Sequence, residues 1–258
     1  MARSTFYYNK QHKRDKWCVE RQRITELYHE NRGRYGYRRL TQAMRNEGYI
    51  ISEKTVRKLM KESGVKCMVR VKKYRSYKGE VGRIAPNLLE RNFHADKPHQ
   101  KLVTDVTEFS LFGTKLYLSP VLDLYNRELI YYTIYEHPVL DMVTEMAKGV
   151  ISVIGSDTNA ILHSDQGWQY QNKRYQNLLK ENNLRQSMSR KGNCLDNSVM
   201  ENFFGLLKSE LLYLQNFASA EDFQNELEKY LHYYNFNRIK LKLNGMSPVQ
   251  YRTQNINI

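Results

Sequence analysis

The 258-residue sequence has only three cysteines and no long apolar run, and these absences exclude several classes of protein. Cys18, Cys67 and Cys194 are widely separated and form no CxxC pair, which argues against a disulfide framework and against a thiolate zinc site. Free thiols are typical of a reducing interior. The first residues lack the apolar centre of a signal peptide, and no stretch approaches the roughly 18 apolar residues of a membrane span. We therefore expect a cytoplasmic protein, associated in a bacterium with the nucleoid.

Acidic residues are scarce in the first third of the chain, so the positive charge of the protein is concentrated there. The net charge is +14. Residues 1–95 hold 24 Lys and Arg against 9 Asp and Glu, whereas residues 96–258 hold 17 against 18. A basic region attached to a neutral body indicates a polyanionic partner. Nucleic acid is the commonest such partner, and an anionic membrane surface is the alternative.

Residues 16–65 are predicted to form three short helices, over about 16–31, 37–47 and 53–63. Ser52 is a good N-cap for the third helix, and Gly48 and Gly64 end the second and third. The apolar positions recur at helical spacing in Val19, Ile24, Leu27, Tyr28, Leu40, Met44, Val56, Leu59 and Met60.

Three short helices with a basic last helix suit a helix-turn-helix unit, whose final helix enters the major groove of DNA. A small bundle with a solvated charged face is the alternative, and the uneven charge favours DNA binding. The candidate DNA contacts in this unit are Arg38, Arg39, Arg57, Lys58 and Lys61.

Residues 66–94 read as a basic linker. Its part 66–83 carries seven basic residues and one acid, with Lys72, Lys73 and Arg75 as candidate DNA contacts. Tyr74 and Tyr77 either stack on bases, as aromatic residues do in single-strand grooves, or are ordinary tyrosines on a strap that follows phosphates.

From residue 95 the pattern predicts a mixed α/β sheet with helices on its faces. Three β-rich runs come first, followed by alternating helices and strands and then by a helical end. The expected strands span 101–111, 115–125, 127–136, 159–165 and 184–189. The expected helices span 139–153 and 171–182, and two successive helical segments occupy 197–237.

Three carboxylates in this region, Asp105, Asp165 and Glu201, come from elements that can converge on one point. Asp105 lies in an apolar strand, where an unpaired charge is costly. Asp165 follows an apolar strand, at the end where α/β sheets place ligand sites. Glu201 lies early in a helix, where Gly205 leaves space beside it and Lys208 puts a cation on the same face.

Oxygen ligands of this kind suit hard divalent cations, and two such ions suit in-line displacement at phosphorus. The sequence therefore predicts a metal-dependent enzyme of DNA strand cleavage and joining. Each acid alone also has a structural interpretation. Glu108, Asp123 and Asp196 are further candidates by residue type, although Asp123 suits a strand end and Asp196 the N-terminus of a helix.

Two further features near the acids have alternative interpretations. The loop 189–197 carries Arg190 and Lys191 and is either a mobile surface loop or a DNA-contacting loop. His163 is either a ligand or a structural residue at a strand end, and the structural role is favoured.

The chain resembles the insertion sequence 3 family of bacterial transposases, as the second-frame protein whose core is similar to retroviral integrase. The strings that carry the resemblance span nearly the whole chain: GRYGYRRL, TDVTEF, VLDLYNR, HSDQGWQY, SMSRKGNCLDNSVMENFFGLLKSEL and YYNFNRIKLKLNGMSPVQY. One departure is Lys240, which follows Arg238 and Ile239 where the family usually has histidine. A zinc-binding N-terminal domain of the retroviral kind is also missing.

The resemblance implies a ribonuclease-H-like core with flanking helices, preceded by a small all-α helix-turn-helix domain. It implies that Asp105, Asp165 and Glu201 are the catalytic acids and that Lys208 is a basic position near DNA. The thirty-five residues between Asp165 and Glu201 match the family spacing. It also implies Mg²⁺ as the cofactor, two ions in each site, with Mn²⁺ as a possible substitute.

The expected domains are an arm (1–15), the helix-turn-helix domain (16–65), the linker (66–94), the catalytic core (95–215) and a C-terminal helical extension (216–258). The expected partners are terminal inverted repeats and target DNA, further copies of the protein, and an upstream-frame product fused by frameshifting, but no membrane. An inactive DNA-binding protein and a nuclease without joining activity are the alternative functions.

Overall fold

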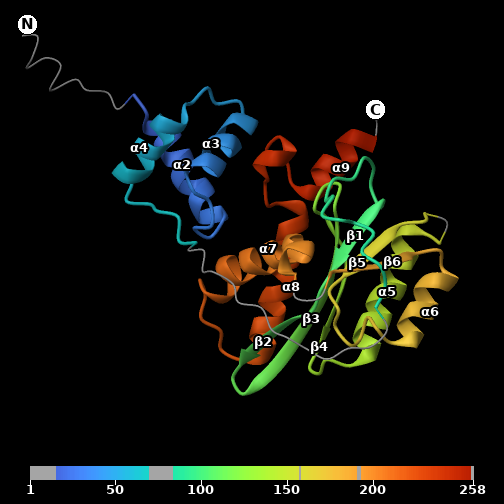
Figure 1. The fold of residues 1–258 in the computed structure, drawn as a ribbon. Helices are drawn as coiled ribbons and strands as arrows, with labels where there is room; N and C mark the ends of the chain where they lie inside the picture. Colours follow the sequence, from blue (N-terminus) through green and yellow to red (C-terminus); the bar gives the residue numbers. More distant parts are fainter. Residues whose placement is uncertain (1–15, 70–83, 157, 191–192, 257–258) are drawn as a thin grey trace, which may run out of the picture. The chain divides into compact units, whose positions relative to one another are not determined.

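The computed structural model describes residues 16–69, 84–156, 158–190 and 193–256, and the chain divides into two compact units (Figure 1). The first, here called the helical unit, holds Met1–Val69 and Ile239–Gly245. The second, here called the core unit, holds Arg70–Arg238 and Met246–Ile258. The domain boundaries given above stay predictions. No helix within the described ranges is long and apolar enough to cross a membrane.

The helical unit is built from α2 (Cys18–Glu30), α3 (Tyr37–Asn46) and α4 (Glu53–Glu62), close to the three predicted spans. Ser52 caps α4 as expected, because its Oγ accepts a hydrogen bond from the Thr55 N–H at 3.1 Å. The predicted apolar positions are buried with one exception. Val19 is 65% exposed, so this apolar position of the first helix does not belong to the buried face.

A short segment from the C-terminal part of the sequence completes the helical unit. The Ile239 N–H donates to the Tyr35 hydroxyl at 3.0 Å, and Asn46 Nδ2 donates to the Gly245 carbonyl at 2.9 Å. Gly245 has φ +76°, and a Cβ there would come 2.3 Å from Gln42 Cγ, so a side chain would not fit. The segment contains the 3₁₀ turn η3 (Leu241–Leu243).

The core unit contains a mixed six-stranded sheet. Its path runs β2–β3–β1–β5–β6, and β4 also pairs with β3. The pairs among β1, β2, β3 and β4 are antiparallel, whereas β5 pairs in parallel with β1 and with β6. The strands are β1 (Lys101–Thr104), β2 (Thr107–Leu111), β3 (Thr114–Asp123), β4 (Leu129–Tyr135), β5 (Ile161–Ser164) and β6 (Arg185–Met188).

The single strand predicted over 101–111 is interrupted at Asp105, which therefore does not lie in the middle of a strand. Thr104 pairs with Val121 and Thr107 pairs with Leu118, so the register against β3 is the same on both sides of the break. That register puts Asp105 opposite Pro120, which has no N–H to donate to the ladder. The interruption follows from a proline on the neighbouring strand and frees the backbone around Asp105 from pairing.

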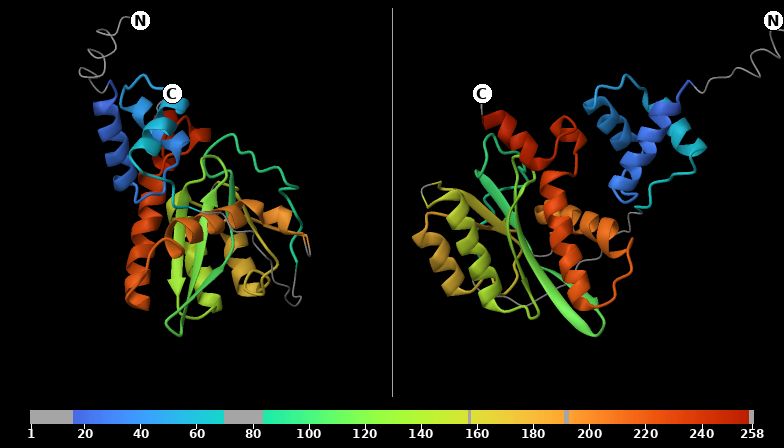
Figure 2. Two further views of the ribbon diagram at one scale, coloured as in Figure 1. Left: turned by 90° about the vertical axis from the view of Figure 1, so that its left-hand side faces the viewer. Right: turned by 180° about the vertical axis from the view of Figure 1, so that it is seen from behind.

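Helices cover both faces of the sheet, as predicted, and give the core unit three layers (Figures 1 and 2). On one face α5 (Leu140–Ile154) and α6 (Lys173–Glu181) pack on Leu102, Val121 and Leu162. On the other face α7 (Ser198–Leu207) and α8 (Ala220–Phe236) pack on Val103 and Leu122. The 3₁₀ turn η1 (Cys194–Asn197) precedes α7, the π-helical turn η2 (Lys208–Leu212) follows it, and α9 (Pro248–Ile256) contacts α8.

Candidate active site

Asp105 lies at the interruption between β1 and β2. Its Oδ1 accepts a hydrogen bond from the Val106 N–H at 2.8 Å. Burial raises the pKa of the Asp105 carboxyl well above its usual range, and the charges of Asp165 and Glu201 raise it further. The Val106 N–H and the Lys208 ammonium act in the opposite direction without reversing the shift. Asp105 therefore occupies a place where a cation would stabilise its ionised form.

Asp165 directly follows β5, the strand that pairs in parallel with β1. Because both strands run in the same direction, Asp105 and Asp165 lie at the same edge of the sheet. Asp165 Oδ1 accepts a hydrogen bond from the Gly167 N–H at 2.8 Å, and burial raises the pKa of the carboxyl. A Cβ at Gly167 would come 3.0 Å from Asp165 Oδ1 and 2.9 Å from Gln169 Oε1, so glycine leaves room for this carboxylate.

Glu201 lies in the first turn of α7 and is half-buried. Burial raises the pKa of its carboxyl, and its charge contributes to the raised pKa of Asp105. A Cβ on Gly205, one turn later, would meet no atom within 4 Å. The open space expected beside Glu201 is therefore confirmed.

Lys208 begins the π-helical turn η2 and points its ammonium group toward the sheet. Its Nζ lies 5.6 Å from the centre of the Phe109 ring. Burial lowers the pKa of Lys208, while the charges of Glu108 and Asp105 oppose the shift. Lys208 is thus within electrostatic range of Asp105.

Asp105 and Asp165 line one cavity of about 220 Å³, but Glu201 does not. Among the residues that the structure describes, no three His, Cys, Asp or Glu side chains form a group that could hold a metal ion. The structure therefore gathers two of the three acids, and the assignment of all three to a metal site stays a prediction. The other lining residues are Val106, Glu108, Tyr117, Pro138, Gly167, Gln169 and Tyr170.

The two carboxylates in this cavity have the chemistry that a divalent cation requires. They supply oxygen ligands only, which magnesium prefers. Their charges also repel each other. Within the described ranges, each carboxylate accepts one hydrogen bond, from a backbone N–H group. A bound cation would remove this repulsion, so the cavity fits one.

Glu108 is a third acid in the cavity, but its carboxylate is already occupied. It accepts a hydrogen bond from the Tyr117 hydroxyl at 2.8 Å and pairs with Lys115 at 3.2 Å. These partners lower the pKa of Glu108. Gln169 and Tyr170 also line the cavity and were not singled out from the sequence, although the string HSDQGWQY contains both.

Asp196, which the sequence suggested to be a helix-terminal residue, is a fully buried anchor for two arginines. Its carboxylate accepts bonds from Arg190 Nε at 2.8 Å, Arg190 Nη2 at 2.9 Å and Arg91 Nε at 2.9 Å. Asn87 Nδ2 adds a bond at 3.1 Å. Arg190 holds the pKa of Asp196 well below its usual range. The predicted DNA contact Arg190 is therefore paired within the protein, and its role toward DNA stays a prediction.

His163 is a structural residue at the end of β5, in agreement with the interpretation favoured from the sequence. Its Nδ1 lies 2.8 Å from Ser187 Oγ and its Nε2 lies 3.1 Å from Ser189 Oγ, so both ring nitrogens are in use. Burial lowers the pKa of His163 to about 4. Asp123 is likewise a buried strand-end group, since it accepts from the backbone N–H groups of His99 and Tyr125.

The candidate DNA contacts of the helical unit gather partly around one aromatic ring. The guanidinium carbons of Arg38 and Arg57 lie 5.6 and 5.8 Å from the centre of the Tyr37 ring, and both side chains are exposed. We call these three residues the Tyr37 cluster. Arg39 lies over Tyr35 at 5.5 Å, Lys58 is 3.7 Å from Glu62, and Lys61 is exposed. Lys72, Lys73, Arg75 and Lys191, and with them Tyr74 and Tyr77, fall outside the described residues.

Family models match most of the chain. A model described as "HTH-like domain" matches residues 18–73, and two described as "Integrase core domain" match residues 95–194 and 201–256. The chain is 52% identical over 256 residues to the putative transposase InsK of insertion sequence IS150 from Escherichia coli K12, covering 98% of this chain and 90% of that protein. It is 31% identical over 257 residues to the transposase InsF of insertion sequence IS3A from the same organism, covering 93% and 89%.

The chain belongs to the insertion sequence 3 family of transposases. A transposase-like protein of Haemophilus influenzae is a further relative, 50% identical over 207 residues that cover 80% of this chain and 95% of that protein. A chain of the simian T-cell lymphotropic virus intasome, solved with the PP2A regulatory subunit B56 gamma, has a similar fold, with a TM-score of 0.52 at 16% identity. The match covers 89% of the transposase chain and 74% of the intasome chain. The predicted fold class, an integrase-like mixed sheet after a helix-turn-helix-like region, is confirmed.

Proposed function

We propose that the transposase cuts DNA at the ends of its element and joins the freed 3′ ends to target DNA. The observation that supports this proposal is the cavity that Asp105 and Asp165 both line. Burial and the charges of Asp165 and Glu201 raise the pKa of Asp105 there, and the charge of Lys208 opposes the shift. Asp105, Asp165 and Glu201 act as the catalytic acids. Water is the attacking group in cutting and a 3′-hydroxyl in joining, and in both steps one P–O bond forms as another breaks.

Asp105 and Asp165 would hold a divalent cation, with Glu201 as the third ligand. Mg²⁺ is the natural ion, Mn²⁺ a substitute, and two ions fill each site. When bound, the ions polarise the phosphodiester and favour deprotonation of the attacking hydroxyl.

The protein's own groups position the phosphodiester. The Gly167 backbone leaves the room that the Asp165 carboxylate occupies, so its oxygens stay directed into the cavity. Lys208 offers a half-buried ammonium group to a phosphate oxygen beside Asp105.

The basic helical unit holds the element ends, and several protomers assemble on the DNA, because two ends must meet before they are joined. The uneven charge of the chain supports this division of labour. Arg190 and Lys191 contact DNA once Arg190 exchanges Asp196 for a phosphate.

The test uses a pre-cut element end with a free 3′-hydroxyl and measures joined product. Asp105→Asn, Asp165→Asn and Glu201→Gln should each lower joining at least about 1,000-fold in Mg²⁺, because removal of an essential charge at a reacting centre costs about 3–4 kcal/mol or more. DNA binding, measured by fluorescence anisotropy, should stay within about twofold. Mg²⁺ should raise the unfolding temperature of the wild type but not of Asp105→Asn.

Two further variants make the test specific. Glu108→Gln changes an acid of the same cavity that is already bonded, and Asp141→Asn changes an exposed acid paired with Arg174. Both should join DNA within about tenfold of the wild type. Full joining by Glu201→Gln would remove Glu201 from the site. Nicking without joining by the wild type would establish a nuclease instead.

A further inference from the structure

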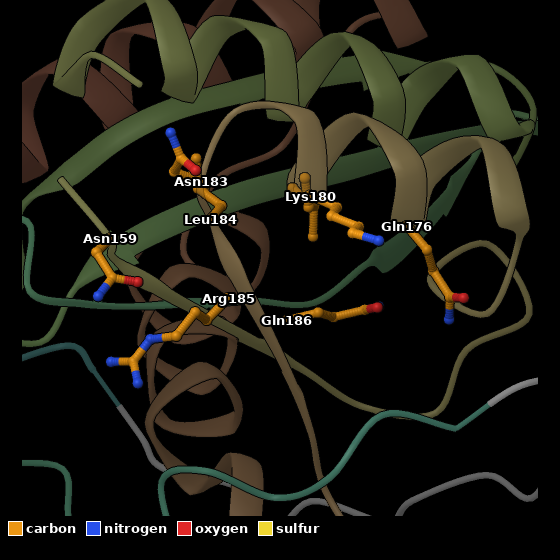
Figure 3. Close-up of a pocket in the computed structure, with 8 residues that line it drawn as sticks. Asn159, Gln176, Lys180, Asn183, Leu184, Arg185 and Gln186 are labelled. Atoms are coloured by element: carbon orange, nitrogen blue, oxygen red, sulfur yellow. The ribbon is translucent and has the colours of Figure 1, made fainter. Parts of the chain in front are cut away.

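A polar depression of about 550 Å³ lies between β6 and α6, where β6 forms an edge of the sheet. Two of its lining residues are leucines, and the others are amides or cations. None of the described residues that line it carries a carboxylate. The polar lining residues, shown in Figure 3, are Asn159, Gln176, Lys180, Asn183, Arg185 and Gln186.

The two cations of this depression, Lys180 and Arg185, are exposed. Among the described residues, neither side chain forms an ion pair or a hydrogen bond. Three exposed or partly exposed arginines of the core unit are paired instead: Arg174 with Asp141, Arg190 with Asp196 and Arg252 with Glu128. Arg185 and Lys180 are therefore available to an external anion, without the cost of breaking an ion pair within the protein.

The side chains of the depression diverge from the strand. In Figure 3, Arg185 and Asn159 lie on one side of β6, whereas Lys180 and Gln176, from α6, lie on the other. A site for one small anion would direct its cations to a common point. Cations that lie apart, with amides between them, suit an extended ligand that carries charge at regular intervals.

The depression lies at the start of β6, one strand length from the end of β5 beside the catalytic cavity. Arg185 pairs with Ile161 at the start of β5, and Asp165 follows the end of the same strand. Four strand residues separate these positions, which corresponds to about 13 Å at about 3.3 Å per residue. A duplex covers that length in about four base pairs, at about 3.4 Å for each.

We propose that Lys180 and Arg185 bind the backbone of the DNA outside the element, which is flanking DNA during cutting and target DNA during joining. The inference rests on the proposed function, since DNA enters the cavity of Asp105 and Asp165 only if that function holds. The element side is assigned to the basic helical unit, whereas residues 96–258 carry 17 basic and 18 acidic residues and have no general attraction for DNA. The core unit therefore needs local cations to hold the second stretch of duplex.

The experiment compares Lys180→Gln/Arg185→Gln with Lys97→Gln/Lys148→Gln in the full chain. The control pair has the same change of net charge, at exposed lysines of the core unit that do not line the depression. Each protein cuts duplexes with the same element end and with 2, 4, 6 or 12 base pairs of flank, and joining is measured with a long target.

With 12 base pairs of flank, the variant of the depression should cut on the order of tenfold more slowly than the control at subsaturating DNA. The slope of log affinity against log salt for flanking duplex should fall by about one to two, as expected for one or two lost phosphate contacts. With 2 base pairs of flank, the two proteins should cut at equal rates, because the duplex no longer reaches the depression.

Equal cutting rates of the variant and the control at every flank length, together with equal salt slopes, would overturn the inference. A lower cutting rate of the variant that persists with 2 base pairs of flank would also contradict it, because the duplex would then not reach the depression. If the proposed function is wrong, the outcome differs from that of a wrong inference, because the wild-type protein itself would then neither cut nor join DNA. Far-ultraviolet circular dichroism and the unfolding temperature show whether both variants fold.

Discussion

Asp196 and the next residue, Asn197, connect the parts of the chain that carry two of the three candidate acids, Asp105 and Glu201. The Asp196 carboxylate binds Arg190 and Arg91, and Asn197 donates from Nδ2 to the Thr104 carbonyl at 3.4 Å. Thr104 immediately precedes Asp105, and the helix that begins at Ser198 carries Glu201. The turn η1 therefore fixes the start of α7 against the end of β1. We expect Asp196 to act as a positioning residue for Glu201.

Asp196→Asn should lower the rate of joining at saturating DNA by about 10- to 100-fold, because small displacements of a catalytic group have large effects on rate. The stability should fall by only about 1–3 kcal/mol, since the arginine partners are partly exposed and can be hydrated. Joining assays and urea unfolding measure the two effects.

The matched control is Glu128→Gln, another buried acid bonded to an arginine, Arg252. Glu128 lies near Asp123, which pairs with Leu102 at the start of β1, opposite the end that carries Asp105. This control should lose similar stability and keep its joining rate. Equal joining rates for the two variants would leave Asp196 with a purely structural role.

The same variant has an expected pH dependence. The pKa of Asp196 is lowered in the folded protein, so its charge stabilises the fold fully above about pH 4, near the pKa of an unfolded aspartate. That stabilisation is lost as the pH falls from about 4 toward the folded pKa. The wild type should therefore lose its stability advantage over Asp196→Asn in this acidic range.

At the residue scale, the sequence identified the acids but not their partners. Asp105 and Asp165 stand out because each is a carboxylate next to an apolar strand. The pairing of Asp196 with Arg91 joins residues 105 positions apart, and only the register of the fold brings them together. The lining residues Gln169 and Tyr170 were hidden for another reason. Glutamine is ordinarily a surface residue and tyrosine is found both inside and outside, so neither residue type by itself indicates a cavity.

At the scale of elements, local signals predicted the helices well and the strands less well. The Ser52 cap and the glycines after α3 and α4 act on neighbouring residues, so the sequence contains the whole cause of these helix ends. The interruption at Asp105 depends on Pro120 in another strand, and its effect appears only once the register is known.

The π-helical turn η2 is held by a buried ion pair that no local pattern revealed. Glu210 accepts two bonds from Arg238, at 2.8 Å from Nε and 2.7 Å from Nη2, and a third from the Tyr230 hydroxyl at 3.0 Å. Both charged side chains are at most 3% exposed. Because η2 begins with Lys208, the pair also fixes the position of that lysine.

Glu210→Gln should destabilise the protein by about 3–5 kcal/mol, because it leaves the buried Arg238 without a counter-charge. Glu226→Gln removes the same charge from a pair with Lys229 whose lysine is 66% exposed, and should cost less than about 1 kcal/mol. Urea unfolding of both variants measures the difference. Similar losses would mean that water or another donor compensates Arg238.

At the scale of the whole molecule, the excess positive charge and the candidate catalytic residues lie in different parts of the chain. The excess of basic residues lies before residue 96, and the candidate acids lie after it. The composition of the sequence alone showed this division. It did not show that Ile239–Gly245 belongs to the helical unit, because the contacts of this segment with Tyr35 and Asn46 span about 200 residues.

The division predicts that DNA affinity and catalysis can be changed separately. Arg38→Gln/Arg57→Gln removes the two cations of the Tyr37 cluster, which are exposed on α3 and α4. The slope of log affinity against log salt for an element-end duplex should fall by up to about two, because each phosphate contact contributes about 0.9. Joining at saturating DNA should stay within about threefold of the wild type, since the acids are unchanged.

Arg23→Gln is the control for this prediction, because Arg23 belongs to the same unit but is bonded to Glu26, Glu30 and Glu47. An arginine already surrounded by three carboxylates has little charge left for a phosphate, so its loss should not alter the salt slope. Fluorescence anisotropy between 50 and 300 mM salt supplies the slopes for all three proteins. If Arg23→Gln lowered the slope as much as the change in the Tyr37 cluster, affinity would follow the net charge of the unit, and the cluster would have no special place in DNA binding.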